Sequence, residues 1–264
     1  MKKSSVLATI LLILTCVMLA SCKSKTESAD YSAIADLDGK VIGMVEAPTT
    51  VAVEQINQMM GANFISIATY PTYNETLMAL KSDRIDAAVV SKPQGLYTVQ
   101  TDPTLKFIAG NGKSPLRVSM LTVTENTELL AQINDAIQAL KDSGELDALN
   151  EKYIEDVSIE EVTLPATIEG AKTIQVGVSG DMPPFDYVSA DGKPSGYNVA
   201  LMGAIASKAG FNVEFVTISF SAKFSALLSD RIDVFFFHYG VLSQEGVTMT
   251  DVYYSDLTGG FIVK

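Results

Sequence analysis

Two regions of the chain show the same succession of apolar and polar patterns. In each region, a first strand-like apolar run is followed by a helix-like segment, and then by a second and a third strand-like run. The first region predicts strands at 40–45, 63–68 and 87–90 and a helix at 50–60. The second predicts strands at 173–178, 212–218 and 234–237 and a helix at 197–209. Strands separated by helical segments favour right-handed crossovers and a mainly parallel sheet in each half.

The third strand of each region follows a nearly identical octapeptide. Residues 79–86 read ALKSDRID and residues 226–233 read ALLSDRID, so that only Lys81 and Leu228 differ. A coincidental match is the alternative, but the matching order of elements around both copies favours a true repeat. The repeat therefore predicts two related α/β lobes.

The chain between the two regions predicts a strand, two helices and a connector. Residues 119–124 are strand-like, and a helical apolar stripe follows at Leu129, Ile133, Ile137 and Leu140. A Ser-Gly pair at 143–144 ends this helix, and a second short helix is expected before residue 154. Residues 154–171 are acidic and contain Pro165, which is typical of a connector.

The first 22 residues predict an export signal. Lys2 and Lys3 precede an apolar run that is shorter than the about 20 residues a membrane span needs. The run ends in Leu19-Ala20-Ser21-Cys22, which resembles the bacterial lipobox, where the Cys is diacylated and becomes the N-terminus. An ordinary signal peptide with an incidental Cys is the alternative. Two acyl chains would anchor Cys22 stably to the outside of the cell membrane.

Composition and charge narrow the function further. The formal charge is −12, which argues against nucleic acid, because a binder needs a basic face against the phosphates. One His and two Cys exclude a His-rich metal site and a four-Cys zinc site, so no metal or cofactor is expected.

Both halves resemble the bacterial extracellular solute-binding proteins of family 3, the polar amino-acid uptake type. In the second half the resemblance is carried by Ile174–Val178, Pro183-Pro184-Phe185, Asp191–Lys193, Gly196–Val199, Asp230–Asp233 and Tyr253–Asp256. In the first half it is carried by Asp36–Gly43, Asp83–Ala87, Leu130–Asn134, Gly144–Leu146 and Lys152-Tyr153. The resemblance implies a two-lobed α/β fold of the periplasmic-binding-protein type II, with a solute between the lobes.

The order of the two halves is reversed relative to that family. We interpret this as a circular permutation, which proteins tolerate when the original termini lie close together. The alternative is a piece of a longer tandem or permease-fused protein. The predicted organisation is a signal (1–21), a tether (22–35), a smaller lobe (36–118), a hinge strand with helices returning to the larger lobe (119–153), a connector (154–171), a larger lobe (172–258) and a second hinge strand (259–264).

Four segments are expected to reach the cleft, because ligands bind at the carboxyl ends of strands. After the strand at 173–178, Asp181 could accept from a ligand amine or cap a turn, and Phe185 could cover a ligand or belong to the core. After the strand at 234–237, His238, Tyr239 and Gly240 should emerge at the cleft, although a lone His is more often a packed or surface group. The triple Phe before them predicts a buried strand.

The other two segments lie in the first half. Thr49 and Thr50 resemble the Gly-Thr-Thr turn of the family, whose hydroxyls and backbone N–H groups receive an anionic group; N-capping explains them equally well. Ser91 follows the strand at 87–90.

Two family positions for zwitterion recognition are changed in this chain. Where the family has a carboxylate-binding Arg the nearest residue is Glu245, and where it has an ammonium-binding Asp the residue is Ser91. The hypothesis is a ligand that is not an ordinary α-amino acid, with Glu245 and Asp181 favouring a cationic or neutral polar solute.

The resemblance implies a binding protein and not an enzyme. The expected partners are a small polar solute, an ABC permease in the membrane and the membrane itself through the lipid anchor, and the chain is expected to be a monomer. The alternatives are a sensory or degenerate binding module and a dehydratase-type enzyme on the same fold. Asp181 and Glu245 are the only carboxylates considered for acid–base work.

Overall fold

The structure is a computed structural model that describes residues 31–46, 57, 63–110, 116–239, 242 and 244–264. Residues 31–264 form one unit, and the description concerns that unit alone. The predicted signal, Cys22 and the helix expected at 50–60 lie outside the described residues, apart from Asn57.

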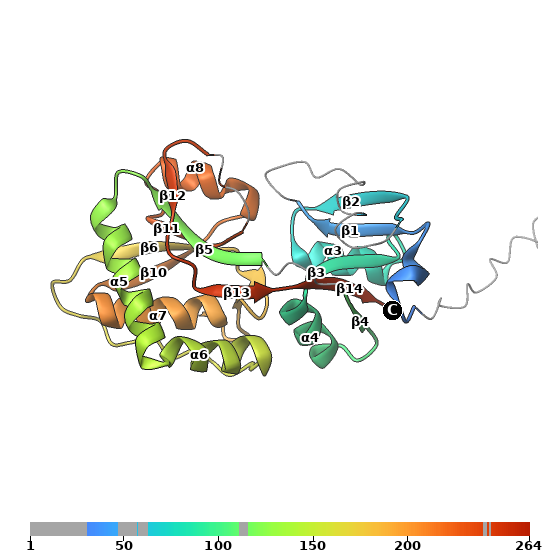
Figure 1. The fold of residues 1–264 in the computed structure, drawn as a ribbon, viewed down its shortest axis with the longest axis horizontal. Helices are drawn as coiled ribbons and strands as arrows, with labels where there is room; N and C mark the ends of the chain where they lie inside the picture. The colour runs from blue at the N-terminus through green and yellow to red at the C-terminus, as the bar shows by residue number, and fades with distance from the viewer. Residues whose placement is uncertain (1–30, 47–56, 58–62, 111–115, 240–241, 243) are drawn as a thin grey trace, which may run out of the picture. The chain divides into compact units, whose positions relative to one another are not determined.

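The first sheet has five strands in the order β2-β1-β3-β14-β4 (Figure 1). β2 (Ser66–Tyr70), β1 (Val41–Val45) and β3 (Ala87–Ser91) are parallel to one another, as the sequence predicts. β14 (Gly259–Val263), from the far end of the chain, pairs antiparallel with both β3 and β4 (Lys106–Ala109). With η1 (Ile34–Leu37), α3 (Tyr73–Lys81) and α4 (Lys92–Thr101), this sheet makes up what we call the β1 lobe.

The second sheet repeats this order, β10-β6-β11-β5-β12. β10 (Asn212–Thr217), β6 (Thr173–Val178) and β11 (Val234–Tyr239) are parallel. β5 (Leu116–Val123) pairs antiparallel with β11, with β12 (Val247–Met249) and with β13 (Tyr254–Leu257). Each sheet therefore contains a strand from the other half of the sequence, β14 in one and β5 in the other.

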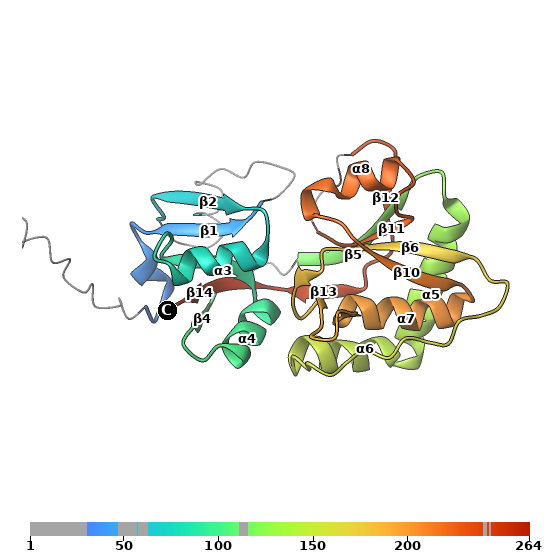
Figure 2. The same cartoon turned by 180° about the vertical axis from the view of Figure 1, so that it is seen from behind.

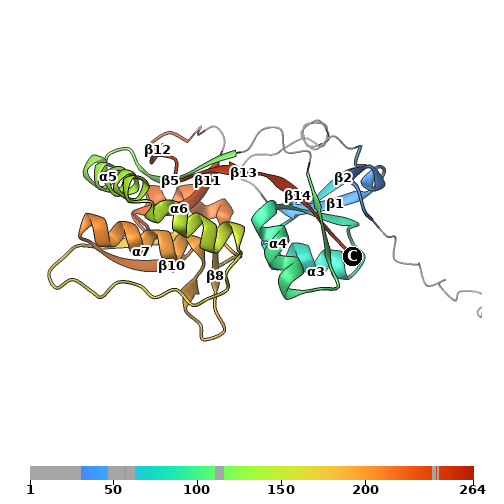
Figure 3. The ribbon, with the colours of Figure 1, turned by 60° about the horizontal axis from the view of Figure 1, so that its bottom comes forward.

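Helices cover both faces of the second sheet, and we call this sheet with its helices the β6 lobe. α5 (Thr127–Ser143), α6 (Glu145–Asn150) and α7 (Tyr197–Ala209) pack against one another and share one core with the sheet (Figure 2). η2 (Glu151–Glu155) continues from α6. η3 (Phe220–Ala222) and α8 (Lys223–Leu228) belong to a separate core on the other face. A small sheet of β7 (Asp181–Met182), β8 (Asp186–Val188) and β9 (Pro194–Ser195) lies beside α7 (Figure 3).

Alternation along β11 divides its side chains between the two cores, because successive residues of a strand point to opposite faces. Val234 and Phe236 belong to the core with α7, whereas Phe235 belongs to the core with α8. Phe235 and Phe236 are each 1% exposed, which confirms the predicted buried strand.

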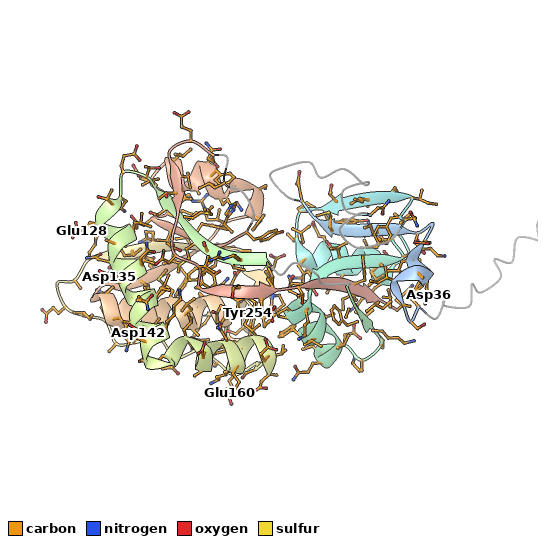
Figure 4. All side chains as sticks on the ribbon, in the orientation of Figure 1. Asp36, Glu128, Asp135, Asp142, Glu160 and Tyr254 are labelled. Carbon is orange, nitrogen blue, oxygen red and sulfur yellow. The ribbon has the colours of Figure 1, made fainter. Side chains whose placement is uncertain are left out.

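The outer side of α5 carries Glu128, Asp135 and Asp142, one every seven residues (Figure 4).

The repeated octapeptide performs the same structural task in both lobes. Asp83 and Asp230 take positive φ angles of 60° and 54° after their helices, a conformation that Asp adopts more readily than most residues. The closing Asp then accepts a backbone hydrogen bond from the first strand of its sheet: Asp86 Oδ2 from the N–H of Val41 at 2.9 Å, and Asp233 Oδ2 from the N–H of Gln175 at 2.8 Å. This shared geometry shows that the sequence repeat is a structural repeat.

The connector crosses the surface of α7. Residues 157–172 form no helix or strand, whereas Ile154 and Glu155, which the sequence assigned to the connector, belong to η2. A Cβ added at Gly203 of α7 would lie 3.2 Å from Leu164 Cδ2 and 3.3 Å from Pro165 Cδ, so the connector packs closely on this helix. The side chain of Asn212 donates to the carbonyl of Ile168 at 2.9 Å and accepts from its N–H at 2.8 Å.

Every helix among the described residues is too short or too polar to cross a bilayer.

Replacing either closing aspartate with alanine should destabilise the protein by a similar amount. Asp86→Ala and Asp233→Ala each remove a charged acceptor from a backbone N–H, which costs about 1–3 kcal/mol in the free energy of unfolding. Urea unfolding of the two variants measures this cost. The control variants Asp83→Asn and Asp230→Asn keep a residue that tolerates positive φ and should change stability by less than about 0.5 kcal/mol. A loss of stability in only one of the variants Asp86→Ala and Asp233→Ala would contradict the structural repeat.

Candidate functional site

The carboxyl ends of the three parallel strands meet at one edge of each sheet. In the β6 lobe, β6, β10 and β11 end at Val178, Thr217 and Tyr239, and the loops that follow carry several polar side chains. In the β1 lobe, the corresponding edge is followed by the start of α3 and of α4. Edges of this kind are the usual ligand sites of parallel α/β sheets.

Asp181 links the two edges. Its Oδ2 accepts from the backbone N–H of Tyr73, the first residue of α3, at 2.9 Å. The first N–H groups of a helix have no partner within it, and the positive end of the helix dipole favours a carboxylate. Burial raises the pKa of Asp181, while the backbone N–H groups of Tyr73 and Asn74 lower it. The sequence suggested a ligand amine or a turn as the partner of Asp181, and the partner in the structure is instead the N-terminus of α3.

A buried carboxylate beside Asp181 organises the loop after β6. Asp186, 1% exposed, accepts from Ser179 Oγ at 2.6 Å, from the N–H of Gly180 at 2.8 Å and from Asn198 Nδ2 at 2.7 Å. Burial raises the pKa of Asp186 despite these three donors. Asn198 Oδ1 is buried and has no hydrogen-bond partner among the described residues. The network fixes the loop that presents Asp181.

Phe185 lies in the core of the β6 lobe. Its ring is 1% exposed and meets the ring of Tyr197 edge to face, with centroids 6.5 Å apart. Gly196 allows the backbone around Phe185 to approach closely, because a Cβ there would lie 2.7 Å from the Phe185 carbonyl oxygen and 2.6 Å from that of Pro184. The suggestion that Phe185 covers a ligand is therefore replaced by its alternative, a core residue.

His238 has an unexpected neighbour in Lys223. His238 is 7% exposed and lies near the carboxyl end of β11, while Lys223, the first residue of α8, is only 2% exposed. Lys223 Nζ lies 3.4 Å from His238 Nδ1 and 3.8 Å from the centroid of the Phe220 ring. The ring of Phe224 is also within cation–π range, at 5.2 Å.

The ammonium group of Lys223 lacks a counter-ion in the described part of the chain. None of the ion pairs formed there includes this residue. Burial lowers the pKa of Lys223 to about 8. Burial and the nearby Lys223 charge together lower the pKa of His238 to about 4. At neutral pH the pair is therefore a buried ammonium beside a neutral imidazole.

The remaining predicted site residues have separate positions. Ser91 caps α4, because its Oγ accepts from the N–H of Gln94 and donates to Gln94 Oε1 at 2.8 Å. Tyr239 and Glu245 are exposed. Thr49, Thr50 and Gly240 lie outside the described residues. Within the described ranges, no group of three or more His, Cys, Asp or Glu side chains is arranged to hold a metal ion.

Sequence reasoning did not identify Lys223 or Asp186. Lys223 belongs to the segment FSAKFSALL, in which it is the only charged residue and takes a position on the buried side of a short helix. That isolation among apolar residues is the signal that could have found it. Asp186 follows Phe185 directly, and only the folded loop shows its three donors.

Part of the chain is similar to a known family of proteins. Residues 174–264 match the family described as bacterial extracellular solute-binding proteins, family 3. PatH of Vibrio harveyi, named as an amino-acid ABC transporter-binding protein, is 35% identical over 86 residues, which make up 33% of this chain and 31% of PatH. The arginine-binding extracellular protein ArtP of Bacillus subtilis is 33% identical over 94 residues, covering 33% of this chain and 34% of ArtP.

The matched part is a limited share of these relatives. The chain spans between about a quarter and a third of the length of the curated relatives it matches. Among solved structures, an ancestral arginine-binding protein bound to arginine aligns with a TM-score of 0.43 and 13% identity, covering 86% of this chain and 85% of that one.

Asp186→Asn should be tolerated, whereas Asp186→Ala should not. The amide introduced by Asn keeps an oxygen for Ser179 and Gly180 and, after a flip of the Asn198 amide, donates to Asn198 Oδ1. We expect the free energy of unfolding to change by no more than about 1 kcal/mol in Asp186→Asn and to fall by about 2–4 kcal/mol in Asp186→Ala, measured by urea unfolding at pH 7.

The pH dependence provides a second check on Asp186. Its folded-state pKa is raised above the unfolded value of about 4, so its charged form destabilises the fold as pH rises above that value. The stability of the wild type relative to Asp186→Asn should therefore fall between pH 4 and pH 7. The exposed Asp191→Asn is the control, and a rise over this interval would contradict the assignment.

Replacing Lys223 with methionine should leave stability unchanged or raise it by about 1–4 kcal/mol at pH 7, because a buried charge without a counter-ion is removed. The folded-state pKa of about 8 lies below the unfolded value of about 10.4, so the cost of the charge is relieved as pH rises through this interval. Urea unfolding at pH 7, 9 and 10.5 should show the free energy of unfolding of the wild type rising relative to that of Lys223→Met. Lys208→Met, at an exposed site paired with Glu145, is the control. A decrease in the stability of the wild type relative to Lys223→Met as pH rises would contradict the prediction.

Proposed function

Because residues 174–264 match the family of bacterial extracellular solute-binding proteins, family 3, we propose that this chain captures a small polar solute between its two lobes and delivers it to an ABC permease. The bond from Asp181 to the start of α3 carries this proposal. It brings the ligand-binding edge of one parallel sheet to that of the other. A solute held there would contact both lobes at once.

Two strands support a hinge between the lobes. β13 of the second sheet is followed directly by β14 of the first, and β5 enters the second sheet from the first lobe. A solute that contacts both lobes when they are closed, and one lobe when they are open, shifts the population toward the closed form. A permease can then distinguish the loaded protein by its shape.

Lipid anchoring and an extracytoplasmic location remain part of the proposal. The lipobox-like sequence at 19–22 supports diacylation of Cys22. An anchor of this kind would keep the protein near its permease and raise the effective concentration without new contacts.

Circular permutation is also a proposal. Strand β14 is inserted between β3 and β4, so the last strand of the chain completes the sheet that its first strand begins. Phe261 and Val263 share a core with Tyr31, Ile34 and Leu37. The packing of β14 against residues 31–37 supports a domain whose halves have exchanged their order.

Solute capture predicts saturable binding coupled to lobe movement. The protein, with Cys16 and Cys22 replaced by Ser, would be labelled with a donor and an acceptor dye at Met78→Cys on α3 and Lys141→Cys on α5. Isothermal titration with the common L-amino acids, amines and small carboxylates identifies a solute. Energy transfer should then change with the same dissociation constant.

Each step has its own contradictory outcome. Binding without a change in energy transfer would remove the hinge mechanism. The absence of binding across the panel would remove solute capture. Sub-micromolar affinity for a simple zwitterionic amino acid would contradict the expectation that the ligand is not an ordinary α-amino acid. Singly labelled proteins control for dye quenching by the solute.

A further inference from the structure

Lys223 is the most isolated charged group among the described residues. The residue is only 2% exposed, and it enters no ion pair in that part of the chain. Its contacts are the nitrogen of His238 and the faces of Phe220, Phe224 and Phe235. An ammonium in such surroundings costs several kcal/mol unless an anion approaches it.

His238 supplies a second donor that has no partner among the described residues. An ammonium has no lone pair, so in its bond to His238 it must donate to Nδ1. The neutral imidazole then carries its hydrogen on Nε2. Nε2 is buried and has no hydrogen-bond partner within the described ranges. Two neighbouring side chains thus present N–H donors, and neither is matched by a protein oxygen there.

The location of this pair agrees with a ligand site. His238 lies near the carboxyl end of β11, and Phe220 follows the carboxyl end of β10. Asp181, which bonds to the β1 lobe, follows the carboxyl end of β6 at the same edge. A group bound by Lys223 would therefore lie on the edge where the proposed solute contacts both lobes.

We propose that Lys223 and His238 form a recognition site for the carboxylate group of a small solute, with the rings of Phe220 and Phe224 beside its apolar part. This inference rests on the proposed function and specifies its ligand class. A carboxylate has two acceptor oxygens, and its charge matches that of the ammonium. One of the three N–H groups of Lys223 is donated to His238 Nδ1, and the rings of Phe220 and Phe224 provide no acceptor oxygen, so the other N–H groups are available to the ligand.

The site implies a preference opposite to the one that Glu245 and Asp181 suggested. The described contacts of Asp181 are made with the first turn of α3, and Glu245 is exposed. The unmatched charge at the edge is positive. The solute should accordingly present an anionic end to the β6 lobe.

Two nearly isosteric probes test the preference for an anion: sodium benzoate and benzamide. Benzoate should bind at least about tenfold more tightly than benzamide in isothermal titration, since a charge-assisted hydrogen bond is worth at least that factor. In NMR spectra of the protein with ¹³C at lysine Cε, benzoate should raise the pKa of Lys223 by about one unit and leave Lys208 unchanged. Benzamide should change neither value.

Variants assign the effect to the two side chains. Lys223→Met should abolish the preference for benzoate over benzamide, whereas Lys223→Arg, which keeps the charge, should retain part of it. His238→Phe should weaken benzoate binding and leave benzamide binding unchanged. Lys208→Met is the matched control and should behave as the wild type. Circular dichroism would establish that each variant is folded, and His238→Phe tests the site independently if Lys223→Met is not.

The outcomes separate this inference from the proposed function. Equal affinity for benzoate and benzamide, or a preference for benzoate that survives Lys223→Met, would overturn the carboxylate site. Binding of an amine or neutral solute with the energy-transfer change described above would then leave solute capture intact. If no probe and no panel solute binds and the Lys223 signal does not respond to benzoate, both proposals fall.

Discussion

The hydrogen-bond ladders of β14 and β5 are the constraint on which the rest of the structure depends. β14 pairs on one side with β3 and on the other with β4, and β5 pairs with β11 and β12. A buried strand must have partners for its backbone groups, so a sheet with a missing inner strand would leave two ladders unpaired. Each lobe is therefore completed by the half of the sequence that builds the other lobe. The loops at the strand ends, including the one that holds Asp181, derive their positions from these ladders.

The two lobes share an architecture but differ in their buried charges. Asp86 and Asp233 hold the first strand of each sheet by the same bond, and Asp83 and Asp230 share the same backbone turn. The β6 lobe differs in carrying a buried cation, Lys223, where an apolar residue would pack at lower cost. A cost of this kind is typical of functional sites, since a group selected for stability alone would not lie there unpaired.

The sequence predicts much of the architecture, because periodicity and repetition report burial directly. The strand at 173–178 and the helix at 197–209 have the expected bounds, and the parallel core of each half follows from the element order. The helices α3, α4 and α8 were not predicted: α8 has six residues and α4 contains Pro93 and Gly95, which weaken a periodic signal. At the site, sequence identified Asp181 and His238 but not their partners. Tyr73 is 108 residues from Asp181, and no local pattern reports such a contact.

The exchange of strands between the lobes has a consequence for the connector. Residues 157–172 form no strand pairing. Their described attachments include the packing of Leu164 and Pro165 on α7, the hydrogen bonds between Ile168 and Asn212, and the ion pairs of Glu160 and Glu161 with Lys152 and Lys193. A polypeptide cleaved within this stretch would give two fragments, one bearing β5 and the other β14. Each fragment would supply the strand that the other's sheet lacks, so the two pieces would remain associated after the peptide bond is cut, and separately made pieces would have to fold together.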